Sequence, residues 1–537
     1  MTLAKPATSL RPALSEWTWV LALLGGFFAF NLATYNLYPA VWCDEPYFSE
    51  PAVNLVKYGS FTTRVWQFSP LNTFPTVNCP LYLLAQVPWL ALLGTSLLAV
   101  RAFNYALMAI AAFLVWRASW RFGLVRSSWA RLLMIPALHL GYGMSYSYRC
   151  SRPDILGMVC VLLLLLAFGL TRPRLRDLCL VLLSATTVWI GLQVALYAWV
   201  ASFAAWLLLS SASRPEHGPQ PLRLREMVLL SLGMALGAGT LVAFLAWKGA
   251  LAWFLPPVVG LLGKNYAHAP QLPVVARLAH LVHEIIACYL EELTSVILLL
   301  GLLILVAPAW KQLTAPTRKL VLFSVALFFG LPAFFDLIGH FAFYYSYMRF
   351  VPLLLAFLAV GSELGANTGE VRRWARPVFA ATLAAGMLVG LPLRLGIVAA
   401  CYRLVPRAEL QRTVASNVSR NDVVFSDMGA FFEAKQAAEV VYDFCSSSAL
   451  LATSIPGRDF TPGEKQSVSV VITSPAQKDH FCGFFGGEWV AVTPPFGDSF
   501  DFTALARLPI IGRKFASYSG QPQNDRHPMQ IFRRSTN

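Results

Sequence analysis

Long apolar runs constrain this chain more than any other feature. A soluble domain of this length would carry about 25% charged residues, whereas this chain of 537 residues is 13% charged and 57% hydrophobic. Many of the runs approach the ~20 residues that a helix needs to cross a membrane. The sequence therefore predicts a polytopic α-helical membrane protein. Eleven spans are expected near residues 17–38, 98–116, 131–147, 154–170, 177–191, 194–210, 227–247, 286–307, 320–337, 342–361 and 377–398.

Basic residues predict how these spans are oriented. The loops that share a face with the N-terminus hold 18 Lys and Arg residues, and the loops of the opposite face hold 7. Cytoplasmic loops are enriched in Lys and Arg, so we expect a cytoplasmic N-terminus and an extracytoplasmic C-terminal tail in a bacterial cytoplasmic (inner) membrane. The stretch 177–210 could instead be one long helix, which would invert everything after it. The net charge of +15 then reflects topology, and nucleic acid is not an expected partner.

Two loops stand out between the spans. Residues 39–97 form the first extracytoplasmic loop, and its apolar stretch 80–94 is short for a span. We expect that stretch to be a helix lying along the membrane interface, with a short true span as the alternative. Residues 248–285 form a second long loop that contains several prolines and histidines. Long loops of this kind are often functional lids, although a solvated connector is an equal alternative.

The tail differs in composition from the rest of the chain. After Tyr402 the apolar runs end, and short β-type runs alternate with a stretch that is compatible with a helix. Such alternation predicts a small α/β domain with a partly parallel sheet. The expected division is a transmembrane module, 1–402, followed by an extracytoplasmic α/β domain, 403–537. The β-type runs are at 422–427, 439–444, 467–474 and 488–493.

Four cysteines fall in the predicted extracytoplasmic parts. Cys43 and Cys79 bracket the first loop, and Cys445 and Cys482 lie in the tail. Disulfides persist in an oxidising compartment, so each pair is a possible bridge. The alternative is that these residues pack as small hydrophobic side chains, because a sequence does not fix the Cα separation that a bridge requires.

Five segments of the chain resemble a known family. The first three resemble the start of the C-type membrane glycosyltransferases (GT-C), and the branch of protein O-mannosyltransferases and lipid A aminoarabinose transferases is the most similar. Residues that match the family pattern in order are Asp44, Glu45, Tyr47, Gly59, Pro80 and Arg101. The segments are VWCDEPYFSEPAVNLVKYG (41–59), PLYLLAQVPWLALLG (80–94), AVRAFNYAL (99–107), YRCSRPDILGMV (148–159) and YMRFVPLLL (347–355). One departure is Asn78-Cys79-Pro80, where some members have a Lys before a Pro pair.

The resemblance implies a reaction and a base for it. In that family a sugar on a polyprenyl phosphate is attacked by an acceptor hydroxyl, and the lipid phosphate leaves. A carboxylate that takes the hydroxyl proton contributes about 10²–10⁴ in rate, and the resemblance nominates Asp44. The same acidic pair includes Glu45, which could orient the acceptor, bind a cation or hold a helix end. Without the resemblance, an Asp-Glu pair would be read as a solvated loop pair.

The leaving phosphate requires positive charge. Candidates on the predicted outer face are Arg349, Lys264 and Arg152, with Arg101 as a weaker one. An unpaired charge near the outer end of a span is costly, which favours Arg349, although snorkelling of its side chain to the interface is the alternative. The secondary acidic residue Asp154 is expected to pair with Arg149 or Arg152.

Metal dependence is left open by the sequence. His280 and His283-Glu284 have the i, i+3 spacing of a metal pair, although two histidines on such a loop are also ordinary interface residues. A divalent cation is a possible cofactor because some GT-C branches use one. The chain lacks a GxxxxGK[ST] phosphate loop, so bound nucleotide is not expected to drive the reaction.

The function predicted from the sequence is sugar transfer from a polyprenyl-phosphate-linked donor to an acceptor hydroxyl on the extracytoplasmic side, with inversion at the anomeric centre. Expected partners are the donor, a lipid, glycan or protein acceptor, and membrane lipids. One alternative is a transporter or flippase of a lipid-linked sugar. Such proteins carry paired halves and ionisable groups near the bilayer centre, and neither is visible here. A second alternative is an inactive relative that serves as a scaffold.

Overall fold

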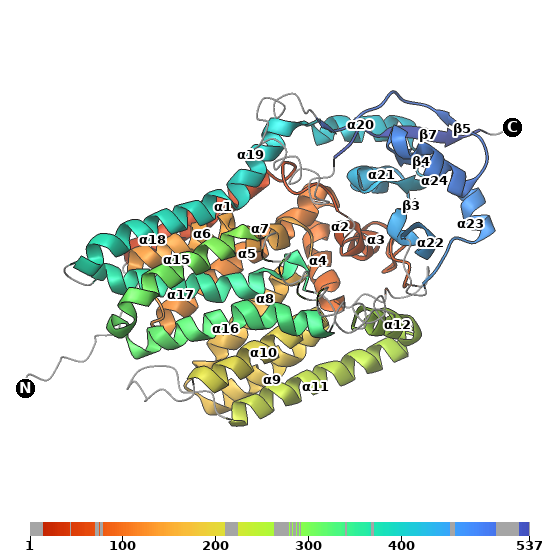
Figure 1. The fold of residues 1–537 in the computed structure, drawn as a ribbon. Coiled ribbons are helices and arrows are strands. Elements are labelled where there is room, and N and C mark those ends of the chain that lie inside the picture. Colours follow the sequence, from red (N-terminus) through yellow and green to blue (C-terminus); the bar gives the residue numbers. More distant parts are fainter. Residues whose placement is uncertain are drawn as a thin grey trace, which may run out of the picture.

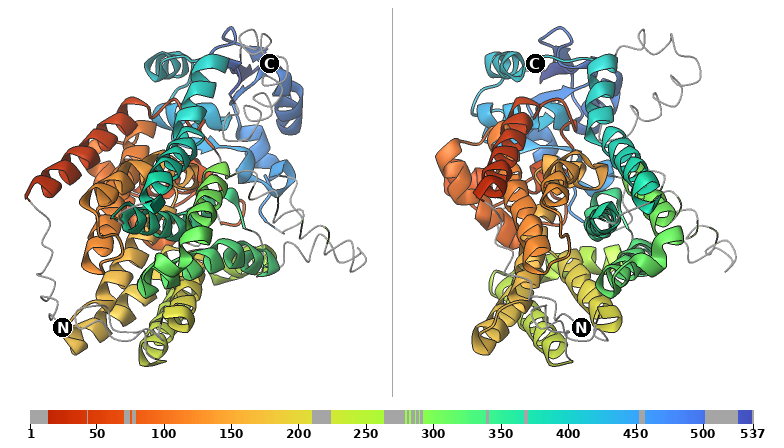
Figure 2. Two further views of the ribbon diagram at one scale, coloured as in Figure 1. Left: turned by 60° about the vertical axis from the view of Figure 1, so that its left-hand side comes forward. Right: turned by 90° about the vertical axis from the view of Figure 1, so that its left-hand side faces the viewer.

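The computed structural model describes residues 14–42, 44–69, 75, 79–209, 224–262, 279, 282, 286, 289, 292–338, 341–366, 370–451, 457–500 and 526–535. Most of this chain is a helical bundle, and the tail forms a smaller layered region at one end of it (Figure 1). We call that end of the bundle the tail end and the opposite one the far end. Two further views show the same arrangement from other sides (Figure 2).

Helices build the region up to Cys401. Pro51 in α3 and Pro80 in α4 stand in the first turn, where a missing backbone N–H leaves no intrahelical hydrogen bond unmade. The Ser96 side chain caps α5 by accepting from the Ala99 N–H. The helices are α1 (Leu14–Ala33), α2 (Asp44–Tyr47), α3 (Glu50–Tyr58), α4 (Pro80–Leu93), α5 (Leu97–Arg121), α6 (Ser128–Leu140), α7 (Tyr142–Arg149), α8 (Asp154–Phe168), α9 (Pro173–Ile190), α10 (Leu192–Leu209), α11 (Leu224–Trp247), α12 (Leu251–Leu262), α15 (Leu293–Ala309), α16 (Ala315–Ile338), α17 (Tyr347–Ala366), α18 (Glu370–Leu388) and α19 (Leu391–Cys401). Short 3₁₀ turns, η1 (Trp310–Gln312) and η2 (Phe343–Tyr345), follow α15 and precede α17.

Six helices in the described part of the chain are long and apolar enough to cross a membrane, and up to eight spans result if each of two bent pairs counts as one. The six are α1, α5, α11, α15, α16 and α17, and each coincides with an expected span. The bent pairs are α7 with α8, at 116°, and α18 with α19, at 41°. The structure therefore confirms a mostly helical membrane architecture but not the count of eleven spans. The other five expected spans fall on the bent pairs or on helices that are too short or too polar to count.

The stretch 177–210 forms two helices. Helices α9 and α10 are broken at Gly191, where an added Cβ would lie 2.8 Å from the Gln193 side chain. A sharper break separates α7 from α8, because Pro153 follows a turn that includes Cys150 and Arg152. This second break places Arg152 beside Asp44 of the first loop and the Ser151 N–H beside Glu45.

The tail contains the α/β layers that the sequence predicts. Its five-stranded sheet has the order β3-β2-β4-β7-β5, in which β3, β2 and β4 are parallel and β7 is antiparallel to both β4 and β5. All four predicted β-type runs form strands, and the helix-compatible stretch forms α21 (Phe431–Ala437). The strands of this sheet are β2 (Val423–Ser426), β3 (Val440–Tyr442), β4 (Val470–Thr473), β5 (Trp489–Ala491) and β7 (Gln530–Arg534). The other tail elements are β1 (Tyr402–Arg403), α20 (Arg407–Asn417), η3 (Met428–Ala430), η4 (Phe444–Ser446), α22 (Ser448–Leu451), α23 (Pro462–Ser467), η5 (Pro475–Gln477), α24 (Lys478–Phe485) and β6 (Ser499–Phe500), and β1 pairs with β6.

The tail is docked on the first loop. Helix α3 lies beside α21 and β3 (Figure 1), and the buried Lys435 amine is 3.2 Å from the Glu50 carboxylate. The same carboxylate accepts from the Thr63 hydroxyl at 2.7 Å. Burial lowers the pKa of Lys435, and the neighbouring Glu50 opposes that shift. The loop that carries the acidic pair is therefore held by the tail as well as by the helices.

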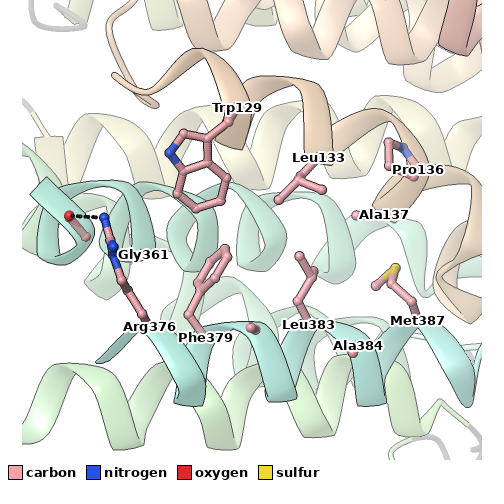
Figure 3. A pocket seen from close by; sticks show the side chains of 12 residues that line it. Trp129, Leu133, Pro136, Ala137, Gly361, Arg376, Phe379, Leu383, Ala384 and Met387 are labelled. Carbon is pink, nitrogen blue, oxygen red and sulfur yellow. Dashed lines mark hydrogen bonds between the residues drawn. The ribbon is translucent and has the colours of Figure 1, made fainter. Parts of the chain in front are cut away.

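A long apolar groove crosses the bundle between α6, α17 and α18 (Figure 3). Its volume is about 560 Å³, and its walls include Trp129, Phe379 and Met387. Arg376 stands at one end and donates to the Gly365 carbonyl at 3.4 Å. Its lining includes none of the residues that the sequence nominates for chemistry, so the candidate site lies elsewhere.

Candidate active site

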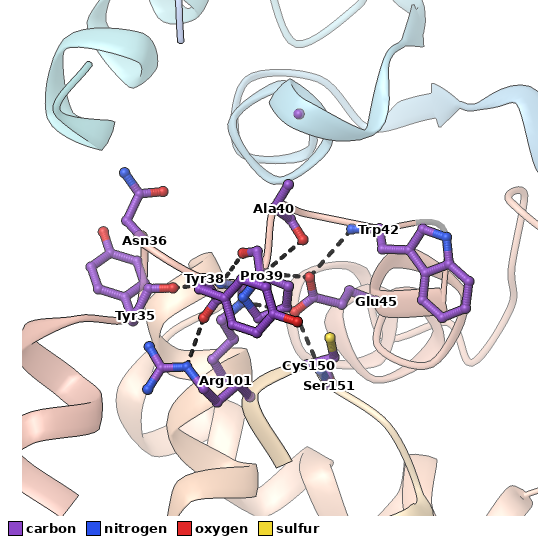
Figure 4. Close-up of polar contacts among 12 residues, drawn as sticks. Tyr35, Asn36, Tyr38, Pro39, Ala40, Trp42, Glu45, Arg101, Cys150 and Ser151 are labelled. Carbon is purple, nitrogen blue, oxygen red and sulfur yellow. Dashed lines mark hydrogen bonds and ion pairs between the residues drawn. The ribbon is translucent and has the colours of Figure 1, made fainter. Parts of the chain in front are cut away.

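Glu45 is buried in a two-pronged ion pair with Arg101 (Figure 4). Arg101 donates from Nε to Oε1 at 2.8 Å and from Nη2 to Oε2 at 2.6 Å. The Glu45 carboxylate also accepts from the backbone N–H groups of Trp42 and Ser151. Neither charged side chain has exposed surface. This geometry commits Glu45 to holding the start of α2, and it commits Arg101 to Glu45 rather than to a phosphate.

Asp44 lies beside this pair and faces a different arginine. Its carboxylate forms an ion pair with the Nη1 group of Arg152, whose Nε donates to Asp154 at 2.8 Å. Of the three carboxylates near this site, Asp44 has 21% of its side chain exposed, whereas Glu45 and Asp154 have none. A substrate can therefore reach Asp44, and the pairing of Asp154 with Arg152 is confirmed.

Aromatic rings surround the Arg152 guanidinium. Its carbon is 3.7 Å from the centre of the Tyr344 ring, 5.6 Å from that of Trp42 and 5.5 Å from that of Phe48. Cations within about 6 Å of a ring face are attracted by its quadrupole. Arg152 is thus fixed at the α7–α8 bend between two carboxylates and three rings, so it can orient Asp44.

Arg349 occupies a separate pocket. Its side chain is fully buried, and its guanidinium carbon is 4.6 Å from the Tyr289 ring centre and 5.4 Å from those of Phe328 and Phe341. An electrostatic interaction links it to Glu292, the N-cap of α15. The structure therefore brings Asp44, Arg152 and Asp154 together, and it places Arg349 against three other rings and Glu292.

Two predicted site residues, Lys264 and Cys43, lie outside the described residues, as do His280, His283 and Glu284. Cys482 is a free thiol, so the structure does not contain the possible Cys445–Cys482 bridge. The possible Cys43–Cys79 bridge stays a prediction, because Cys43 is not described. Cys482 packs among phenylalanines of the tail. Cys445, the other residue of the possible Cys445–Cys482 bridge, lies where the tail docks on the first loop. The Cys445 carbonyl accepts from the Gln67 N–H at 2.9 Å.

The described residues contain no group of three or more His, Cys, Asp and Glu side chains that could hold a metal ion. At the candidate site, the Arg152 guanidinium stands between Asp44 and Asp154. The carboxylates of Asp44 and Asp154 are therefore bridged by the guanidinium of Arg152.

The sequence did not predict the role of Glu50. Its carboxylate accepts from the Arg64 N–H at 2.7 Å and from the Val65 N–H at 3.3 Å, as well as from Thr63 and Lys435. The acidic residue stands at the start of α3 with Pro51 next to it, which is a helix-start signal. That signal locates the helix, but not the lysine 385 residues away that completes the ion pair.

The fold and this site together define the class of protein. It is a polytopic membrane protein in which a helical bundle carries an acidic first loop beneath a small α/β tail. No protein-family model matches the chain, and no curated protein matches its sequence. Solved structures with a similar fold are GT-C glycosyltransferases, as the sequence resemblance implied.

Among these structures, ArnT from Cupriavidus metallidurans in the apo state has a TM-score of 0.52 at 12% identity, over 90% of this chain and 97% of ArnT. ArnT bound to undecaprenyl phosphate has a TM-score of 0.49 at 14% identity, over 90% and 98%. The archaeal oligosaccharyltransferase AglB from Archaeoglobus fulgidus, in complex with an inhibitory peptide and a dolichol-phosphate, has a TM-score of 0.48 at 11% identity, over 91% and 74%. The apo ArnT comparison shows that the fold is shared.

Proposed function

We propose that this protein is a glycosyltransferase that moves a sugar from a polyprenyl-phosphate donor to an acceptor hydroxyl. The observation that carries the proposal is the partly exposed carboxylate of Asp44. This residue lies on the loop that resembles the GT-C acidic loop, and Arg152 holds it by an ion pair. ArnT, whose apo form shares this fold, is also known with bound undecaprenyl phosphate, and we propose a lipid carrier of that class here.

In the proposed mechanism the acceptor hydroxyl hydrogen-bonds to the Asp44 carboxylate. The acceptor oxygen forms a bond to the anomeric carbon, the bond from that carbon to the phosphate oxygen breaks, and the hydroxyl proton passes to Asp44. A single displacement of this kind inverts the anomeric centre. The lipid phosphate leaves with the bonding electrons, and Arg152, Lys264 and Arg349 are the proposed sources of compensating charge.

Glu45 has a positioning role in this proposal. Its carboxylate is saturated by Arg101 and two backbone N–H groups. It therefore fixes the first turn of α2, where Asp44 is the neighbouring residue. Because it has no exposed surface, it holds the base in place without contacting substrate.

The proposed orientation follows the basic residues of the loops. The N-terminus faces the cytoplasm, and the tail end with Asp44 faces outward from the inner membrane. We further propose that 1–402 act as the catalytic membrane module and 403–537 as an extracytoplasmic domain. The docking of the tail on the first loop supports placing both on the same side.

The test compares wild type with Asp44→Asn in membranes supplied with a panel of radiolabelled polyprenyl-phosphate sugars. Wild type is expected to consume one donor, and Asp44→Asn is expected to lose at least about 10²-fold in rate. The matched control is Asp479→Asn, an exposed tail carboxylate, which should keep wild-type activity. If wild type consumes no donor, the flippase or scaffold alternative replaces the enzyme. If Asp44→Asn consumes the donor at the wild-type rate, Asp44 is not the base.

A further inference from the structure

A second cavity, of about 200 Å³, lies between the first loop and the tail. The first loop contributes its Ala40–Trp42 stretch, just before the candidate base. The tail contributes residues from the start of α20, from the turn after β2 and from the approach to β7. Its lining is Ala40, Val41, Trp42, Val405, Arg407, Leu410, Asp427, Met428, Gly429, Phe444, Gly497, Asp498, Arg526, His527 and Met529.

The cavity borders the carboxyl end of a parallel strand. Strand β2 lies between its parallel neighbours β3 and β4 and ends at Ser426, so Asp427 is the next residue. In open α/β sheets, ligands bind outside the carboxyl ends of the strands. The tail sheet therefore directs its ligand-binding edge toward the first loop.

Asp427 and His527 form a polar pair on this edge. The Nε2 atom of His527 is 3.1 Å from Oδ2 of Asp427, and the other carboxylate oxygen accepts from the Gly429 N–H at 3.0 Å. The His527 side chain is 28% exposed and the Asp427 side chain is 14% exposed. A carboxylate with a histidine beside it offers hydrogen-bond acceptors and donors within one small space.

The other charges that line the cavity are compensated. Arg407 is 3.2 Å from the Glu433 carboxylate, and Arg526 forms an ion pair with Asp498. Arg526 also donates to the Asn36 carbonyl at 2.7 Å. Because each arginine already has a carboxylate, the cavity suits a neutral ligand with many hydroxyls better than a phosphate or a lipid headgroup.

The volume and the apolar walls of the cavity limit the class of ligand further. An apolar cavity of about 150 Å³ can hold a benzene molecule, so a cavity of about 200 Å³ is on the scale of one six-membered sugar ring. The lining aromatic residues Trp42 and Phe444 add apolar surface, and such surface packs against the C–H face of a sugar.

Trp42 connects this cavity to the candidate active site. It lines the cavity, and its ring centre is 5.6 Å from the guanidinium carbon of Arg152, which pairs with Asp44. We propose that the cavity binds a neutral sugar unit of the acceptor, with Asp427 and His527 recognising its hydroxyls. The proposal rests on the proposed transferase function and makes the acceptor a glycan or a glycosylated molecule.

The test measures binding, not transfer. Purified full-length protein in detergent is mixed with methyl glycosides of glucose, galactose, mannose and N-acetylglucosamine, and contact is detected by saturation-transfer NMR. At least one glycoside is expected to bind wild type and also Asp44→Asn. His527→Ala and Asp427→Asn should weaken that binding by about tenfold or more, the effect of losing a hydrogen bond to a charged group.

His480→Ala changes an exposed histidine of α24 in the same tail and should leave binding unchanged. His527→Gln keeps a hydrogen-bonding side chain, and partial recovery of binding with it would exclude simple misfolding. The proposal is overturned if no glycoside binds wild type, if His527→Ala binds as wild type does, or if inorganic phosphate displaces the glycoside. Because Asp44→Asn should still bind sugar, failure of the transferase proposal and failure of this one give different results.

Discussion

Two buried ion pairs of the same kind, one in the first turn of α1 and one in α2, have different surroundings. At the far end, Glu16 pairs with Arg131 at 2.8 Å, and at the tail end Glu45 pairs with Arg101 at 2.6 Å. Both arginines extend from a neighbouring helix and also donate to backbone carbonyls. Two-pronged pairs of this sort combine charge with fixed geometry, so one pair fixes the start of α1 to α6 and the other fixes α2 to α5.

The two ion pairs, Glu16–Arg131 and Glu45–Arg101, differ in the side chains beside them. The Glu16 carboxylate also accepts from the Trp116 indole at 3.0 Å, and its surroundings are closed. Beside Glu45, the chain adds Asp44, which is partly exposed and shares Arg152 with Asp154. The buried glutamate–arginine pair is common to both places, whereas the candidate chemistry depends on one additional carboxylate, Asp44, that solvent can reach.

The largest expected effect is a difference in sugar transfer between the variants Arg152→Ala and Arg131→Ala. Arg152→Ala leaves Asp154 buried without its cation, which should cost about 3–5 kcal/mol of unfolding free energy, and it also releases Asp44. Arg131→Ala should cost a similar amount, because Glu16 is equally buried. Denaturant unfolding in detergent measures the stability, and sugar transfer per folded molecule measures the function. The comparison fails if Arg131→Ala lowers transfer per folded molecule as much as Arg152→Ala does.

A smaller effect is expected for the glutamates. Glu45→Gln and Glu16→Gln each weaken hydrogen bonds to a charged partner, at a cost of about 1–3 kcal/mol. Only Glu45→Gln should slow transfer, by up to about 10²-fold, because a small displacement of the base is costly. The pH profile of the remaining activity should keep its wild-type shape, since Glu45 transfers no proton. A displaced pH profile would mean that Glu45 itself takes part in proton transfer.

The smallest effect concerns a third pair, which faces water. Asp422 pairs with Arg533 at 3.0 Å, and the arginine side chain is 40% exposed. Burial raises the pKa of Asp422, but hydrogen bonds from Arg533, Ser419 and Ser469 outweigh burial and lower its pKa to about 2.

A depressed carboxyl pKa stabilises the fold above the unfolded value of about 3.9, and this contribution is lost as the pH falls from about 4 to about 2. Asp422→Asn should therefore flatten the pH dependence of the protection against hydrogen exchange, relative to the unfolded chain, in strand β2 of the full-length protein over that interval. Asp479→Asn should keep the wild-type dependence. An unchanged slope in Asp422→Asn would assign the acid sensitivity to another group.

The fold was largely predictable because hydrophobicity and β-propensity act locally. The six strongest spans and four strands appear at the expected positions. The sequence could not decide the break at Gly191, because helix hydrophobicity continues across it. It also missed β7, since Gln530–Arg534 is short and polar at both ends and becomes a strand by pairing with β4 and β5.

The site was predictable only in part. Resemblance located Asp44 and Glu45, but the division of roles between them depends on Arg101, 56 residues farther along. The burial of Arg349 behind aromatic rings and the free thiol of Cys482 are likewise consequences of long-range packing. Local patterns indicate which residue types are present, whereas partners distant in sequence decide what those residues do.

The contact of Arg526 with the first loop has a consequence for biogenesis. Arg526 donates to the carbonyls of Asn36 and Leu37, where α1 leads into the acidic loop. A ribosome delivers that loop 490 residues before Arg526. The segment before Asp44 therefore acquires these hydrogen bonds only after the tail has been made. A chain terminated before Arg526 would present an unfinished loop, so the order of synthesis itself delays the completion of the loop until the tail is present.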